Sequence, residues 1–174
     1  MAEKDRGHLV KFCQYLSLPD SEIEAIIKNG VGGAITKDNP ISVVKICNKS
    51  IIQNLQDKGI NPRKSGMEKP YKCSSIALET AYIRGLLDGD GYLRFTQYGM
   101  GLVGSYEICK YVRDFINDNV SPIENESIYP HDSIWKFAIA GRLQTSKILS
   151  FFYDNASVYL DRKYKLYQEK YYNN

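Results

Sequence analysis

The sequence predicts an α+β fold, and three observations lead to that prediction. From residue 75 to residue 171, helix-like segments alternate with pairs of strand-like segments in the order αββαββα, followed by a terminal helix. Part of this order recurs in the first 72 residues. The helix predicted at 75–88 ends among aspartates and glycines, which concentrates polar chemistry at one helix end.

The helix predicted at Ser75–Asp88 opens the complete unit. Ser74 and Ser75 are N-cap residues by type, and Glu79 follows them at the start of the helix. Apolar side chains recur at helical spacing at Leu78, Tyr82, Ile83, Leu86 and Leu87. A second stripe with almost no side chain consists of Ala77, Ala81, Gly85 and Gly89. We expect this stripe to pack closely against a second helix, either from another copy or from a missing segment.

The remaining elements of the unit follow from alternating and helical patterns. Two strands are predicted at Tyr92–Gln97 and Gly101–Gly104, joined by a hairpin around Tyr98–Gly99. A helix at Tyr106–Asn119 is ended by Ser121–Pro122. After it the patterns predict strands near Ser127–Tyr129 and at Ile134–Ala140, and helices at Leu143–Tyr153 and Asp161–Tyr171.

The first half repeats the second from its middle onward. Four segments recur in the same order: helix His8–Leu16, strand Ile41–Ile46, helix Ser50–Lys58 and the stretch Ile60–Lys64, which ends in Arg-Lys as Tyr159–Lys163 does. The first half lacks a counterpart of the 75–88 helix and of the hairpin after it. We therefore predict an incomplete first half-domain at 1–72 and a complete second one at 73–174.

Composition limits the functional classes. Apolar residues make up 43% of the chain, enough for a core, and no stretch is long and apolar enough to span a membrane. Four scattered cysteines predict reduced thiols rather than a zinc site, and hence a reducing intracellular location, the cytoplasm or an organellar matrix. The net charge is +3, but residues 45–72 hold seven Lys or Arg against two acids, a patch that suits a phosphate backbone or simply a solvated face.

The segment Ile83-Arg-Gly-Leu-Leu-Asp-Gly-Asp-Gly91 resembles the LAGLIDADG motif of homing endonucleases, a family tied to intron and intein mobility. Only Ile83, Arg84 and Gly89 depart from the motif. The resemblance implies two such helices packed side by side beneath a saddle-shaped antiparallel DNA-binding sheet. Single-chain members of the family carry two motifs and homodimeric members carry one near the start, whereas this motif lies mid-chain.

The acidic segment has two other interpretations. Gly and Asp favour turns, so Asp-Gly-Asp-Gly is also compatible with a simple helix-to-strand connection. A calcium loop starting at Asp88 requires an acid at its twelfth position, which is Gly99, and is rejected.

The resemblance also implies roles for individual residues. Asp90, the last acid of the motif, is expected to bind Mg²⁺ at the scissile phosphate, with Asp88 positioning the turn or serving as a second ligand. Lys163 is expected to hold phosphate charge or polarise the attacking water, with Lys64 as its counterpart in the first half. Lys165 and Arg162 are competitors for that role.

DNA contacts are expected from strand residues that face away from the core. Alternation places Leu93 and Phe95 inward, so Tyr92, Arg94 and Thr96 face DNA. Trp135 and Phe137 also face inward, which leaves Lys136 outward. Arg94 is the expected base reader, because arginine pairs well with guanine. The remaining expected contacts are Lys45 and Lys64.

The predicted function is sequence-specific cleavage of double-stranded DNA with a divalent metal. The alternative is a cleavage-inactive nucleic-acid-binding protein of the same fold, such as an RNA maturase or a transcription regulator. Retention of Asp90 favours cleavage, and the missing first motif favours the alternative. Nothing specific favours a purely structural domain.

Overall fold

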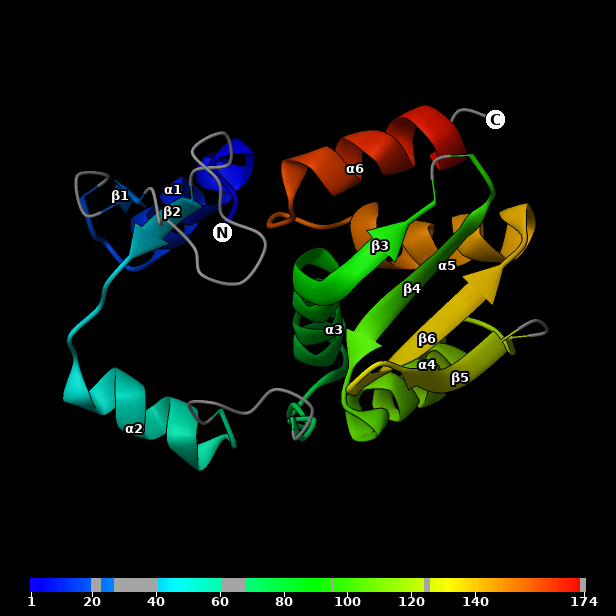
Figure 1. Ribbon diagram of the computed structural model, residues 1–174, viewed down its shortest axis with the longest axis horizontal. Coiled ribbons are helices and arrows are strands. Elements are labelled where there is room, and N and C mark those ends of the chain that lie inside the picture. The colour runs from blue at the N-terminus through cyan, green and yellow to red at the C-terminus, as the bar shows by residue number, and fades with distance from the viewer. Residues whose placement is uncertain (20–22, 27–40, 61–67, 95, 124–125, 173–174) are drawn as a thin grey trace. The chain divides into compact units, whose positions relative to one another are not determined.

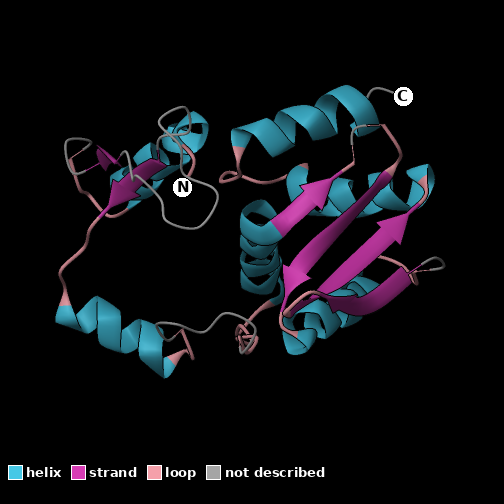
Figure 2. Cartoon of the chain, in the orientation of Figure 1, coloured by secondary structure: helices cyan, strands magenta, loops and turns pink. Residues whose placement is uncertain are grey.

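The computed structural model describes residues 1–19, 23–26, 41–60, 68–94, 96–123 and 126–172. These residues form two compact units (Figures 1 and 2). One contains Met1–Asn48 with Leu160–Arg162, and the other contains Lys49–Tyr159 with Lys163–Asn174. The predicted halves at 1–72 and 73–174 were defined by repeated sequence rather than by compactness, so they stay a prediction.

The smaller unit contains a short 3-10 helix η1 (Glu3–Asp5), helix α1 (Arg6–Tyr15) and strands β1 (Ile23–Ile26) and β2 (Ile41–Val44). The two strands pair antiparallel, with Ile23 opposite Val44. The predicted helix and the predicted strand are therefore confirmed. Strand β1 was missed, because four residues give too short a pattern to distinguish from a loop.

The larger unit begins with α2 (Lys49–Asp57) and then shows the predicted order: α3 (Ile76–Asp90), β3 (Gly91–Leu93), β4 (Gly99–Gly104), α4 (Tyr106–Asn119), β5 (Glu126–His131), β6 (Ile134–Ala140), α5 (Arg142–Tyr153) and α6 (Asp161–Tyr167), which continues as a π-helix η3 (Gln168–Tyr172). The four strands make one antiparallel sheet in the order β3-β4-β6-β5. The prediction of an α+β fold with an antiparallel sheet is confirmed.

The core of this unit lies between the sheet and its helices. Helices α4 and α5 lie behind the sheet in Figure 1, and both contact its strands. Met100, Leu102, Phe137 and Ile139 project from β4 and β6 onto this side and are almost fully buried. Trp135 is on the same side, where its ring packs against Tyr106 of α4 at a centroid distance of 4.9 Å. The inward prediction for Trp135 and Phe137 is therefore confirmed.

The first predicted hairpin differs in its strand lengths. Strand β3 ends at Leu93 rather than Gln97, and β4 begins at Gly99 rather than Gly101. The carbonyls of Arg94 and Gln97 accept hydrogen bonds from Lys170 Nζ, at 2.8 and 3.2 Å, instead of joining a strand ladder. A side chain from the C-terminal segment thus satisfies two carbonyls of the hairpin connection, while the backbone N–H of Arg94 still donates to Gly99 O at 2.9 Å. Local alternation cannot reveal this arrangement.

Candidate functional site

Helix α3 carries the acidic motif to its last residues. Its start is fixed by Ser75, whose hydroxyl accepts a hydrogen bond from the backbone N–H of Leu78 at 3.3 Å, as the sequence predicted. Ile83 and Leu87 are buried against the core. The helix runs two residues beyond its predicted end at Asp88, so that Asp90 is its final residue.

The two motif carboxylates have different surroundings. Asp88 is 6% exposed, and its Oδ1 accepts a hydrogen bond from the hydroxyl of Tyr153 on α5 at 2.6 Å. Asp90 is exposed. Asp88 is thus held against the core, in keeping with a positioning role. Its service as a second metal ligand stays a prediction.

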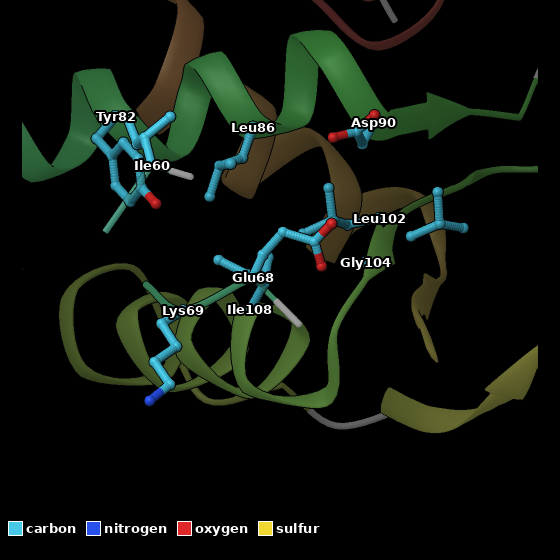
Figure 3. A pocket seen from close by; sticks show the side chains of 10 residues that line it. Ile60, Glu68, Lys69, Tyr82, Leu86, Asp90, Leu102, Gly104 and Ile108 are labelled. Atoms are coloured by element: carbon cyan, nitrogen blue, oxygen red, sulfur yellow. The ribbon is translucent and has the colours of Figure 1, made fainter. Parts of the chain in front are cut away.

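Asp90 borders a pocket of about 210 Å³ (Figure 3). Tyr82 and Leu86 of α3 and Leu102 and Ile108 on the opposite side supply much of its apolar wall. The Glu68 side chain also reaches the pocket. Its Oε2 is buried and has no hydrogen-bond partner among the residues described. Sequence reasoning missed Glu68, because it precedes the helix in a stretch without periodicity.

Lys163 lies at the end of α3, but its ammonium faces the protein backbone. It is 4% exposed and donates hydrogen bonds to the carbonyls of Leu87, Asp88 and Gly91 at 2.6, 2.8 and 2.5 Å. Of its competitors, Lys165 is exposed beside Glu169, and Arg162, which belongs to the smaller unit, pairs with Asp5 of that same unit. Lys163 thus lies beside the motif, and its catalytic role stays a prediction.

The small-residue stripe of α3 is open among the described residues. Ala77, Ala81, Gly85 and Gly89 are all exposed, and a Cβ at either glycine would meet no described atom within 4 Å. Two larger apolar side chains beside the stripe are exposed as well, Ile76 at 61% and Leu78 at 57%. The stripe has the shape expected of an interface with a second helix, and that partner stays a prediction.

The side of the sheet opposite the core carries cationic and aromatic groups. Tyr92 lies across Gly101, where any Cβ would meet the phenol ring at about 2.6 Å. The ammonium of Lys136 is 4.6 Å from the centre of the same ring. The Arg94 side chain lies beside Gly99 on this side. We call this surface, defined by Tyr92, Arg94 and Lys136, the open face.

Further cations gather at the tip of the β3–β4 hairpin. Lys170 and Arg142 lie 4.8 and 5.1 Å from the centre of the Tyr98 ring. Tyr171 donates a hydrogen bond from its hydroxyl to Gly99 O at 3.2 Å, and burial raises the pKa of this phenol. Sequence reasoning missed Lys170 and Arg142, because they come from segments remote from the hairpin along the chain.

Two predicted DNA contacts lie elsewhere, and the location of a third is not described. Thr96 is exposed in the connection between β3 and β4 rather than on a strand. Lys45 is exposed in the smaller unit, with its Nζ 3.6 Å from a carboxylate oxygen of Glu24. Lys64, like the inward-predicted Phe95, lies outside the described residues.

The residues near Asp90 suit a hard cation better than a soft one. Asp90 and the unpartnered Oε2 of Glu68 offer carboxylate oxygens at one pocket, the ligand type that Mg²⁺ prefers. The described residues contain no group of three or more His, Cys, Asp or Glu that could hold a metal. Any ion bound here therefore needs water, phosphate or a second protein segment to complete its shell.

Comparisons with known proteins bear on the fold. No family model and no curated protein matches the chain. Among solved structures, the N-terminal LAGLIDADG domain of WhiA is similar, with a TM-score of 0.53 and 18% identity over 91% of this chain and 69% of that domain. Full-length WhiA from Thermatoga maritima has a TM-score of 0.53 and 17% identity over 92% of this chain, which spans about half the length of that protein (48%). The described residues also contain no helix able to cross a membrane. Together, the topology and these structural neighbours establish a LAGLIDADG-like fold for the chain.

Proposed function

We propose that the chain binds double-stranded DNA across the open face and hydrolyses a phosphodiester bond with Mg²⁺ held by Asp90. The supporting observation is the connection between the two parts of the site. Asp90 ends α3, and the chain passes within two residues to Tyr92 on the open face. A phosphate bound by Lys136 or Arg94 would therefore lie near an exposed carboxylate.

Each residue of the proposed site has a separate role in the reaction. Bound Mg²⁺ would activate water and stabilise the charge that develops on the phosphate. Asp90 supplies a carboxylate oxygen to the ion, and Glu68 offers a second at the same pocket. Lys136 and Arg94 neutralise the DNA backbone, and Arg94 also has the donor geometry for guanine. Asp88, held by Tyr153, fixes the last turn of the helix.

A second acidic motif would complete the double-strand site. The open stripe of α3 is where we propose that a second helix packs, from another copy or from a further segment. Close packing along Gly85 would bring a second motif carboxylate alongside Asp90. Because the four cysteines are free thiols, we further propose that the protein works in a reducing intracellular compartment.

The test begins by selecting a binding site from a random duplex library. Supercoiled plasmid carrying that site is then incubated with Mg²⁺, with and without EDTA. Asp90→Asn should abolish nicking while DNA binding persists. Asp118→Asn, which removes the same charge from an exposed position on α4, is the matched control and should nick like the wild type. An Asp90→Asn protein that nicks at the wild-type rate contradicts the proposal.

The second candidate is a cleavage-inactive nucleic-acid-binding protein. It is favoured by the described residues' lack of a three-ligand metal cluster and by the burial of Lys163 among backbone carbonyls. Tight, salt-sensitive binding to the selected duplex, without nicking at any Mg²⁺ concentration, would establish this candidate instead. Parallel binding to structured RNA distinguishes a maturase-like role from a DNA-binding one.

A further inference from the structure

The C-terminal end of α3 is closed by a side chain from another helix. Helices often end in a left-handed glycine whose backbone N–H groups satisfy the last carbonyls. Here Gly91 has φ −83° and ψ 164°, which is extended backbone, and one N–H group, its own, bonds to Leu87 O. Lys163 instead reaches the carbonyls of Leu87, Asp88 and Gly91.

A buried cation suits this position for two physical reasons. The last turn of a helix leaves carbonyl oxygens without partners and carries the negative end of the helix dipole. An ammonium group has three donors and no acceptor, and a buried one must find acceptors for all of them. The three carbonyls around Lys163 meet this need, since each accepts one of its hydrogen bonds.

The carbonyls bound by Lys163 bracket Asp90. Leu87 and Asp88 precede it, and Gly91 follows it directly. At Gly91 the backbone passes so close that a Cβ would lie 2.3 Å from Leu87 O. The ammonium thus ties together the last helical turn and the first residue of β3, with Asp90 between them.

We infer that Lys163 is a positioning residue that holds the backbone of Asp90, and through it the Asp90 carboxylate, in the geometry that binds the metal ion. This inference rests on the proposed function, in which Asp90 is a metal ligand. It assigns to Lys163 a role that acts through the backbone. Contact with the phosphate, the role expected from the sequence, would require those N–H groups to leave their carbonyls.

A side chain of α3, Arg84, in turn contacts the segment that precedes α6. Its Nε donates to Val158 O at 2.9 Å and its Nη1 donates to Phe152 O at 3.0 Å. Helix α3 thus holds the segment that leads into α6, while Lys163 of α6 closes α3. Arg84, one of the departures from the LAGLIDADG motif, thus makes a structural contact in this chain.

The experiment compares Lys163→Ala with Lys165→Ala in the full chain. Lys165 is two residues away on the same helix, with its side chain 76% exposed beside Glu169, so it controls for the loss of one charge. Mn²⁺ affinity is measured from the broadening of Asp90 NMR signals, and hydrogen exchange is measured at the amides of residues 89–92. Neither measurement requires cleavage.

Lys163→Ala should weaken Mn²⁺ binding by about tenfold, the range found for residues that orient a metal ligand. Amide exchange at 89–92 should become faster, and Lys165→Ala should change neither quantity. Methylammonium should restore both, because it can donate N–H groups to the vacated carbonyls. Tetramethylammonium at equal ionic strength should not, because it has no N–H group.

A general loss of stability is separated from positioning by two further variants. Ile116→Val shortens a buried side chain on α4 and should leave Mn²⁺ affinity unchanged. Lys163→Met keeps the aliphatic stem and replaces Lys163→Ala if the latter does not fold. Unchanged exchange and Mn²⁺ affinity in a folded Lys163 variant, or equal rescue by tetramethylammonium, would overturn the inference. A wild-type protein that binds no Mn²⁺ at Asp90 would instead refute the proposed metal site.

Discussion

At the scale of single residues, burial separates two aspartates that the sequence presents as equivalents. Asp88 and Asp90 are two positions apart, which on a helix directs their side chains to different sides. Asp88 meets Tyr153 in the core, and Asp90 meets solvent at the helix end. The same residue type therefore serves the fold in one place and the proposed chemistry in the other.

The first residue-scale prediction concerns the charge of Asp90. Asp90→Asn keeps the side-chain shape but removes the negative charge that attracts Mg²⁺, so cleavage of the selected duplex should fall below detection. DNA affinity should stay equal or rise, because one repulsion toward phosphate is removed. A gel-shift titration beside the nicking assay measures both effects, and a parallel fall in both would point to a folding defect.

The second residue-scale prediction concerns the stability supplied by Asp88. Asp88→Asn weakens a buried, charge-assisted hydrogen bond and should cost about 1–3 kcal/mol of unfolding free energy. Tyr153→Phe removes the donor of the same hydrogen bond, so it should cost a similar amount. Urea denaturation of both single variants and the double variant measures their coupling. Fully additive losses would show that the hydrogen bond contributes little.

At the scale of elements, helix α3 has three sides with different surroundings. Ile83 and Leu87 face the core, Tyr82 and Leu86 line the pocket, and the stripe through Ala81 and Gly85 is open. The sheet is likewise two-sided, with the core on one side and the open face on the other. Each element thus contributes one side to stability and leaves another for a partner.

The element-scale prediction for α3 is that Gly85→Leu abolishes association without unfolding the chain. The added side chain has space in the chain by itself, because no described atom lies within 4 Å of a Cβ there. It would hold a second helix away, since close packing tolerates no extra volume. Sedimentation velocity over a concentration series measures the association. The control is Ala156→Leu, which adds a leucine side chain outside any helix. Gly59→Leu is unsuitable as a control, because Gly59 has φ 78°, a backbone conformation that leucine rarely adopts.

The element-scale prediction for the sheet is that Lys136→Ala and Arg94→Ala weaken DNA binding in different ways. Each lost phosphate contact should lower the slope of log affinity against log salt by roughly 1. If Arg94 reads a base, its removal should also cost about 1–3 kcal/mol of discrimination at one base pair. Fluorescence anisotropy at several salt concentrations measures both, with Lys147→Ala on α5 as the control. Salt-independent binding by the wild type would contradict the open-face assignment.

At the scale of the whole molecule, buried weak acids link stability to alkaline pH. Burial raises the pKa of the Cys109 thiol from 9.0 to about 11. It also raises the pKa of Tyr111 and Tyr167, whose hydroxyls donate to Glu79 and Asp154. In each case folding favours the protonated form.

The whole-molecule prediction is that the protein loses stability at alkaline pH, because folding raises these pKa values. A folded pKa above the unfolded one means that the folded state keeps protons that the unfolded chain releases. Stability should therefore be full below about pH 9 and fall as the pH rises from about 9 to 11. Urea midpoints at pH 8 and pH 10.5 measure the loss, and Cys109→Ala should reduce the difference between them. Equal urea midpoints at the two pH values in the wild type would contradict this prediction.

The sequence by itself determined the elements of the larger unit and the location of the acidic motif. These depend on local patterns: the Ser75 cap, the apolar spacing of Ile108, Val112 and Phe115, and the alternation around Phe137. Such patterns report which side of an element is buried, because burial is periodic along helices and strands. The location of Tyr92 and Lys136 on the side of the sheet opposite the core followed for the same reason.

Only the tertiary structure decided what each polar group meets. Tyr153 holds Asp88, Lys163 closes α3, Glu68 reaches the pocket beside Asp90, and Lys170 binds the carbonyl of Arg94 after β3. All four contacts depend on residues that are far apart along the chain. Hydrogen bonds of buried polar groups are satisfied by whatever segment packs against them. The sequence shows the group and its need for a partner, and packing selects the partner.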